Sequence, residues 1–307
     1  MNRRIFLAST AKAGVVCASG FIGERLLAQE PGSRQGAANY QIGCYTRPFD
    51  KFDYRVGLDA IVEAGFRYLG LMTTNTKEWD MIRPTTPPEE VQSFRAEANQ
   101  RGLKIISVFG DFSVAVSVEQ GIRELKRLID HTEICGCPSL MFGGTADEKL
   151  YQAYYKVVGE CCDYAGTKGI ALSIKPHGGL NSTGPECRKA IELVQKKSFG
   201  LWYDPGNIYY YSDGKLDPVE DAATVDGLVV GMSVKDFRPP KEVHVNPGTG
   251  KVNFAAVLAR LNKGGFTHGP LVLECLERGP LDAVKAAAKS AREFIEHLRV
   301  QGPDLNR

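Results

Sequence analysis

The sequence alternates eight short runs of β-favouring residues with longer amphipathic stretches, from residue 40 to residue 300. The amphipathic stretches place apolar residues three and four positions apart, as at Leu58, Ile61 and Val62, which is the spacing of one helix face. Strands that alternate with helices in this way form parallel sheets, because each helix returns the chain to the start of the next strand. The candidate strands are residues 40–45, 68–72, 104–109, 139–142, 171–175, 200–203, 229–234 and 271–273.

Eight such units without a break in composition predict the α/β class and a single (β/α)8 TIM barrel over residues 40–300, followed by a short tail at 301–307. The strands are almost continuously apolar, which is expected when both faces of a sheet are buried. The competing fold, an open doubly wound sheet, normally carries a glycine-rich turn after its first strand. Residues 44–48 occupy that position here and contain no glycine, so the barrel is favoured.

The formal charge of +2 comes from the N-terminal segment of the 307-residue chain. Residues 1–30 hold four cationic and two anionic side chains, which leaves 34 Lys and Arg residues against 34 Asp and Glu residues in the remainder. A neutral body offers no electrostatic footprint for a phosphate backbone, so nucleic acid is not an expected partner.

The N-terminal residues resemble an export signal. A pair of arginines, Arg3 and Arg4, precedes a weakly apolar stretch that is interrupted by Lys12. Because this pattern is typical of twin-arginine signals, we expect residues 1–29 to be a signal peptide, residues 30–39 a linker, and the protein to be exported to the periplasm. The stretch is too short and too interrupted for a stable membrane span. The alternative is an ordinary amphipathic N-terminus.

Charged residues end the last four predicted strands. Lys175, Asp204, Lys235 and Glu274 follow or end strands five to eight, and the active site of a TIM barrel is built at these carboxyl ends. The four side chains are therefore expected to converge on one mouth, where a lone buried charge would be costly. Two alternatives remain open, since two lysines and two carboxylates could serve a ligand or could simply neutralise one another.

Other side chains near the predicted mouth suit substrate binding or proton transfer. His177 is a candidate general acid or base because its pKa ordinarily lies near working pH, although it could also only orient a loop. Lys235 and Arg47, which follows the first strand, are candidate substrate-binding residues. Tyr209 and Asn207 are further candidates, because tyrosine rings suit the faces of sugars and amides bond to sugar hydroxyls. The alternative for the tyrosine is loop packing.

Five short segments at the strand ends, in this order, resemble the xylose isomerase-like TIM barrels. This superfamily of sugar phosphate isomerases and epimerases includes the AP endonuclease 2 relatives, and the resemblance spans about residues 40 to 300. The segments are His177-Gly178-Gly179, Asp204-Pro205-Gly206-Asn207, Val234-Lys235-Asp236, the segment from Gly248 to Phe254, and the segment from Gly269 to Glu274.

The resemblance implies a divalent metal such as Mn, Mg or Zn, which many members hold with a Glu, an Asp, a His and a Glu on strands five to eight. Asp204 and Glu274 match two of these metal ligands, whereas Lys175 stands at the first Glu position and Ser233 at the His position. Two carboxylates alone make a poor transition-metal site, so the ligand set is incomplete. Our hypothesis is that Lys175 replaces the metal by bridging Asp204 and Glu274, although His177 or Asn207 could still complete a metal site.

The resemblance also implies a small carbohydrate as partner and a sugar isomerase or epimerase as function. Proton abstraction next to the carbonyl of a keto-sugar would use Glu274 or His177 as base, with Lys175 and Lys235 stabilising the enolate. A keto-sugar lyase or dehydratase on the same site is one alternative, and a non-catalytic sugar-binding barrel is another. An abasic-site endonuclease is disfavoured, because the five histidines of the chain are too scattered for a trinuclear metal site.

Overall fold

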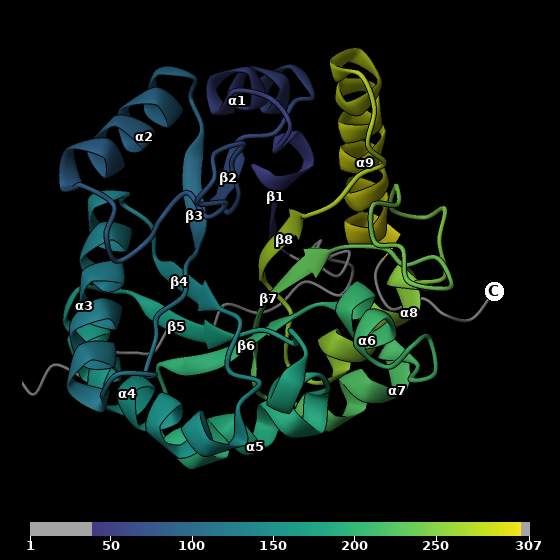
Figure 1. Cartoon of the computed structure of the whole chain (residues 1–307). Coiled ribbons are helices and arrows are strands. Elements are labelled where there is room, and N and C mark those ends of the chain that lie inside the picture. Colours follow the sequence, from purple (N-terminus) through teal and green to yellow (C-terminus); the bar gives the residue numbers. More distant parts are fainter. Residues whose placement is uncertain (1–38, 302–307) are drawn as a thin grey trace, which may run out of the picture. The chain divides into compact units, whose positions relative to one another are not determined.

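The eight predicted strands pair in sequence order and close a parallel barrel (Figure 1). This computed structural model describes residues 39–301, and it confirms the predicted (β/α)8 fold. The last strand pairs with the first, with Gly43 opposite Val272 and Cys44 opposite Leu273. The strands are β1 (Tyr40–Tyr45), β2 (Tyr68–Leu71), β3 (Lys104–Phe109), β4 (Ser139–Phe142), β5 (Ala171–Ile174), β6 (Phe199–Tyr203), β7 (Val229–Val234) and β8 (Gly269–Leu273).

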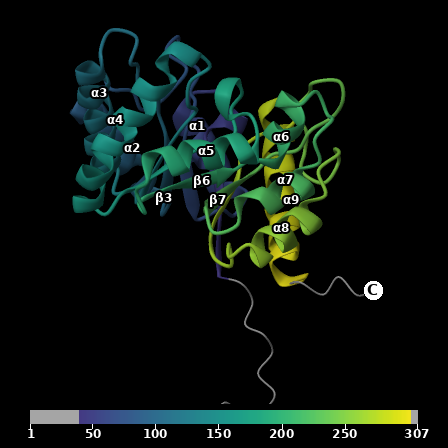
Figure 2. The same cartoon turned by 90° about the horizontal axis from the view of Figure 1, so that it is seen from below.

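Helices surround the barrel, with α2, α3 and α4 gathered on one side and α6 to α9 on the other (Figures 1 and 2). Two short helices, α6 and α7, follow β6 where the sequence predicted none. Each is too short for an apolar face to repeat, and each begins at a proline after a capping aspartate. The helices are α1 (Tyr54–Glu63), α2 (Pro88–Gln100), α3 (Val118–Ile134), α4 (Glu148–Thr167), α5 (Gly184–Val194), α6 (Pro205–Tyr211), α7 (Pro218–Ala222), α8 (Phe254–Lys263) and α9 (Leu281–Gln301).

The predictions for the two ends of the chain fall largely outside the described residues. The signal peptide and the linker up to residue 38 lie there, as do residues 302–307 of the predicted tail. None of the helices between residues 39 and 301 combines the length and the apolar character that a membrane crossing needs.

Large side chains fill the inside of the barrel below its carboxyl end. The Tyr45 hydroxyl lies 2.9 Å from the Ser107 hydroxyl, so the polar end of this buried ring is satisfied. Close packing of this layer makes the barrel a core rather than a pore, and any ligand must bind above it. The interior cluster consists of Tyr45, Met72, Ile106, Phe109, Met141, Trp202 and Val272.

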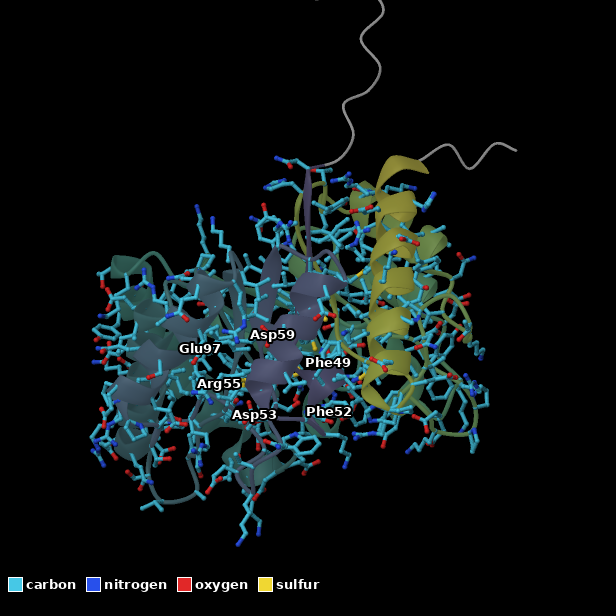
Figure 3. All side chains as sticks on the ribbon, turned by 90° about the horizontal axis from the view of Figure 1, so that it is seen from above. Phe49, Phe52, Asp53, Arg55, Asp59 and Glu97 are labelled. Atoms are coloured by element: carbon cyan, nitrogen blue, oxygen red, sulfur yellow. The ribbon has the colours of Figure 1, made fainter. Side chains whose placement is uncertain are left out.

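On the outside, exposed ion pairs join α1 to α2 (Figure 3). Asp53 caps α1 by accepting a hydrogen bond from the backbone N–H of Arg55, and the Arg55 guanidinium pairs with Glu97 at 2.8 Å. Arg101 pairs with both Asp59 and Glu97 at 2.6 Å. Such exposed pairs contribute little individually, so we attribute the position of α1 mainly to the burial of its apolar face.

A buried carboxylate organises the long loop after β7. Asp236 is fully buried and accepts four backbone hydrogen bonds. The donors are the N–H groups of Phe237 at 2.8 Å, Gly248 at 3.0 Å, Gly250 at 2.9 Å and Val252 at 3.0 Å. Two of the segments that carried the family resemblance, around Asp236 and from Gly248 onward, are thus held together, and Lys235 is fixed at the end of β7.

Replacing Asp236 with alanine leaves these four donors without their acceptor, and hydrogen bonds to a charged group contribute about 1.5–3 kcal/mol each. We expect Asp236→Ala to lower the free energy of unfolding by at least about 3 kcal/mol, measured by urea denaturation. The control is Asp163→Ala, an exposed aspartate paired with Lys196, with an expected change within about 0.5 kcal/mol. Equal effects of the two substitutions would contradict the assigned role of Asp236.

Candidate active site

Four charged side chains meet at the carboxyl end of the barrel. The Lys175 ammonium contacts both carboxylates, with Nζ 2.8 Å from Asp204 Oδ2 and in direct contact with Glu274 Oε2. Lys235 Nζ lies 3.0 Å from Glu274 Oε1 and 3.6 Å from Asp204 Oδ2. No side chain of the four is more than 5% exposed. We call Lys175, Asp204, Lys235 and Glu274 the charge quartet; its formal charges cancel.

Each member of the quartet compensates the burial of another. Burial alone would raise the pKa of Glu274, but the charges of Lys175 and Lys235 outweigh it and hold that pKa well below its usual range. Burial alone would lower the pKa of Lys235, but Asp204 and Glu274 outweigh it and raise that pKa. Glu274 is therefore a carboxylate and Lys235 an ammonium at neutral pH.

The quartet leaves hydrogen-bond donors unused. An ammonium group has three N–H donors. Lys175 directs one of them to Glu274 and forms an ion pair with Asp204 Oδ2, and Lys235 hydrogen-bonds to Glu274 and to Asn207 Oδ1, the latter at 2.8 Å. Each lysine therefore has at least one N–H that no protein hydrogen bond uses.

Ser233, which the resemblance places at the position of a metal-binding histidine, orients the glutamate. Its hydroxyl donates to Glu274 Oε2 at 2.6 Å and accepts from Trp202 Nε1 at 3.0 Å. The chain from Trp202 through Ser233 links the interior cluster to the quartet. Glu274 thus receives hydrogen bonds from Ser233, Lys175 and Lys235, which leaves it a poor proton acceptor.

Asp204 and Asn207 connect the quartet to α6. Asp204 Oδ1 caps this helix by accepting from the Asn207 backbone N–H at 2.9 Å, which leaves Oδ2 facing Lys175. The Asn207 side chain donates to the Pro176 carbonyl at 2.6 Å and accepts from Lys235. Gly206 permits this close approach, since a Cβ there would lie 2.6 Å from the Lys235 carbonyl oxygen. The side-chain amide of Asn207, which was predicted to bind substrate, thus hydrogen-bonds to protein groups.

His177 lies at the mouth above the quartet. Its ring is exposed to solvent, with ring centroids 6.0 Å from those of Phe109 and Tyr211. Partial desolvation by the walls of the mouth, and then the charges of Lys175 and Lys235, lower the pKa of His177. The imidazole is therefore neutral at neutral pH.

The tyrosine run after β6 faces two directions. Tyr209 is 5% exposed and packs between Phe237, at 5.5 Å between ring centroids, and the Lys251 ammonium at 4.3 Å. Tyr211 lies beside His177 and directly over Gly178, where φ is +88° and a Cβ would meet the ring at 2.6 Å. Tyr209 is thus packed among protein side chains, in line with the loop-packing alternative, whereas Tyr211 is the tyrosine that lies beside His177.

Sequence reasoning passed over one ionisable group at this end of the barrel. Asp111 follows β3 and accepts hydrogen bonds on Oδ1 from the Phe112 backbone and the Tyr154 hydroxyl, at 2.9 and 3.0 Å. Burial raises the pKa of Asp111 to about 7. Its place directly after a strand was the available signal, because proton-transfer groups of TIM barrels occupy such positions.

A family assignment follows from the match between the sequence and known proteins. Residues 58–299 match the family described as the xylose isomerase-like TIM barrel. The chain belongs to this family. No curated protein sequence gives a significant match.

Solved structures with the same fold come from distant relatives. A xylose isomerase domain protein from Planctomyces limnophilus is 23% identical with a TM-score of 0.65, over 86% of this chain and 98% of that one. A D-allulose 3-epimerase from Methylomonas sp., in complex with D-allulose, is 15% identical with a TM-score of 0.68, over 85% and 97%. A xylose isomerase-like TIM barrel protein from Mycobacterium smegmatis, in complex with magnesium, is 20% identical with a TM-score of 0.70, over 87% and 99%.

The residues at the mouth do not fit the divalent metal that the resemblance implied. The Lys175 ammonium lies between Asp204 and Glu274, where it would repel a cation. Ser233 donates its proton to Glu274. Across residues 39–301, no group of three or more His, Cys, Asp and Glu side chains is arranged to hold a metal ion. His177 and Asn207 do not complete such a set, because Asn207 is engaged by Lys235 and Pro176.

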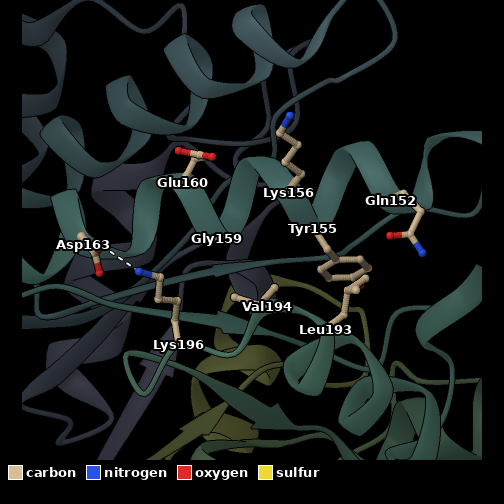
Figure 4. Close-up of a pocket in the computed structure, with 9 residues that line it drawn as sticks. All are labelled: Gln152, Tyr155, Lys156, Gly159, Glu160, Asp163, Leu193, Val194 and Lys196. Carbon is tan, nitrogen blue, oxygen red and sulfur yellow. Dashed lines mark hydrogen bonds and ion pairs between the residues drawn. The ribbon is translucent and has the colours of Figure 1, made fainter.

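A separate groove lies on the outer surface between α4 and α5 (Figure 4). Its volume is about 410 Å³, and its lining includes Tyr155, Leu193 and the ion pair between Lys196 and Asp163. The groove is formed by helix faces rather than by strand ends. We therefore place the chemistry at the mouth and not in this groove.

The quartet makes a sharp prediction about stability. Lys175→Met leaves two buried carboxylates with one ammonium, which should cost about 3–5 kcal/mol of unfolding free energy. Adding Glu274→Gln restores charge balance, so the double variant should be more stable than the sum of the single effects predicts, by at least about 1 kcal/mol. Urea denaturation of the four proteins measures this coupling.

The exposed pair of Lys196 and Asp163 provides the matched control. The same cycle with Lys196→Met and Asp163→Asn should give a coupling below about 0.5 kcal/mol. Additive effects at Lys175 and Glu274 would show that the quartet is not an interacting unit.

Proposed function

We propose that this protein is a keto-sugar isomerase or epimerase in which lysine ammonium groups perform the electrostatic role of a metal ion. The observation that carries the proposal is the contact of the Lys175 ammonium with both Asp204 and Glu274 at the barrel mouth. This arrangement fixes a positive charge between the two residues that match metal ligands of the family. A fixed charge of this kind stabilises an oxyanion without reorganisation during the reaction.

The proposed step is the removal of a proton from the carbon next to a carbonyl. The C–H bond breaks, its electron pair forms a C=C bond, and the carbonyl oxygen becomes an enolate oxygen. The free N–H donors of Lys235 and Lys175 bind that oxygen. Return of the proton to the former carbonyl carbon, with transfer of the neighbouring hydroxyl proton to the enolate oxygen, gives the isomer. Return of the proton to the opposite face of the original carbon re-forms the carbonyl and gives the epimer.

His177 is the proposed proton acceptor. Glu274 is unsuited, since three hydrogen-bond donors already bind its oxygens. The imidazole of His177 is neutral, so it can take a proton, although desolvation and then the charges of the same two lysines lower its pKa to about 3 before substrate binds. Because the enolate forms beside these lysines, its negative charge offsets theirs and strengthens the base as the reaction proceeds.

Two alternative functions, a lyase and a non-catalytic sugar-binding protein, are compatible with the same site. A lyase would eliminate a leaving group from the same enolate, so the first step would be shared. A non-catalytic sugar-binding barrel is favoured by one fact, the burial of all four quartet side chains to 5% exposure or less. The free donors on Lys175 and Lys235 and the open position of His177 support catalysis instead.

We also propose that the protein works outside the cytoplasm. The support is the arginine pair Arg3 and Arg4 before a weakly apolar stretch. An exported barrel would meet carbohydrates that are largely unphosphorylated.

The assay for this function is exchange of deuterium from solvent into a panel of keto-sugars, followed by NMR. We expect exchange by the wild type that persists after dialysis against EDTA. Lys175→Met and His177→Gln should each lower the exchange rate about 100-fold or more, since each removes a group that acts in the transition state. Thermal melts show whether each variant remains folded.

Asp111→Asn is the matched comparison, because Asp111 directly follows a strand and burial raises its pKa to about 7. Loss of exchange in Asp111→Asn with full exchange in His177→Gln would assign the base to Asp111 and overturn our assignment. Sugars that stabilise the protein without any exchange would indicate the binding barrel. Exchange accompanied by loss of a hydroxyl would indicate the lyase.

A further inference from the structure

Arg47 presents an unpaired guanidinium at the mouth. It follows β1, and its side chain is partly buried, with Nε inaccessible to solvent and without an acceptor. Within residues 39–301, no carboxylate lies within ion-pair distance of Arg47, and its Nε–H has no acceptor. Its side-chain neighbours are the Cys275 thiol, which is within hydrogen-bonding reach, and Trp79, whose ring centroid lies 5.9 Å away.

Neighbouring arginines at this end of the barrel are satisfied. Arg278 pairs with Asp50 at 3.2 Å and lies 3.0 Å from His244 Nε2, and Arg238 pairs with Glu277 at 2.7 Å. A partly buried guanidinium without an anionic partner in contact is costly unless a ligand supplies one. Arg47 therefore differs from these two arginines in having no carboxylate partner, as expected of a side chain that binds an anionic ligand.

The charge around Arg47 is not cancelled by the quartet. Glu274 lies close enough for its charge to act on Arg47, but its oxygens are already bound by Lys175 and Lys235. Asp50 and Asp80 are the other nearby carboxylates. Neither is within ion-pair distance of Arg47; Asp50 pairs with Arg278, and burial raises the pKa of Asp80 to about 6. The mouth thus offers one positive charge with free donors.

We infer that the substrate is a sugar acid, and that Arg47 binds its carboxylate. This inference rests on the proposed function and names its substrate class. The planar guanidinium matches a carboxylate in shape and can form two parallel hydrogen bonds with it. One uncommitted cation balances a carboxylate monoanion, whereas a phosphate dianion would need a second one, and Lys235 and Arg278 are already paired.

Calorimetric titration of the full chain tests the inference. The probes are glucuronate and galacturonate, the matching neutral hexoses, and the hexose 6-phosphates. We expect the uronates to bind at least about tenfold more tightly than the neutral hexoses, because a charge-assisted bidentate contact contributes about 1.5–3 kcal/mol. Arg47→Met should remove this preference, and Arg47→Lys should retain only part of it.

The matched control is Arg238→Met, which removes a rim arginine that is paired with Glu277 and should keep the full preference. Retention of the preference in Arg47→Met would overturn the inference, as would tighter binding of the phosphates or no binding of either uronate. Failure of the proposed function is distinguishable from these results. Uronates that bind through Arg47 without any solvent exchange would leave the inference standing and refute the chemistry.

Discussion

The ammonium of Lys175 between the carboxylates of Asp204 and Glu274 is the interaction on which the mouth of this barrel depends. Either carboxylate would be expensive to bury at this depth without a cation, and a lysine there would be equally expensive without an anion. Lys235 completes the balance. A neutral group of four charges can therefore lie above an apolar interior, at the place where the resemblance implied a metal ion.

The fold fixes this arrangement from several sides. The strand order brings the ends of β5, β6, β7 and β8 together, so each supplies one charge. Ser233 accepts a hydrogen bond from Trp202 and donates one to Glu274. Asn207 accepts one from Lys235 and donates one to the Pro176 carbonyl, just after β5. Asp236 then closes the loop after β7. The side chains that do the proposed chemistry are thus held in place by hydrogen bonds from neighbouring side chains and loops.

Sequence reasoning reached the barrel and the quartet because both depend on order along the chain. Apolar runs locate strands, and the residue after each strand lies at the mouth whatever the details of packing. Sequence reasoning could not predict which way individual side chains point. Tyr209 and Tyr211 differ by two residues in a short helix, but Tyr209 is buried against Phe237 whereas Tyr211 is only partly buried, beside His177. The unpaired state of Arg47 likewise depends on where carboxylates from other loops lie.

The central claim is that an ammonium takes the place of a metal, and calorimetric titration of EDTA-dialysed protein with Mn²⁺ tests it most directly. The account predicts no stoichiometric binding by the wild type. The variant that combines Lys175→Glu with Ser233→His would restore the four ligand types of the resemblance beside Asp204 and Glu274, and it should bind one ion per chain. One tightly bound ion in the wild type, lost in Asp204→Ala, would contradict the account.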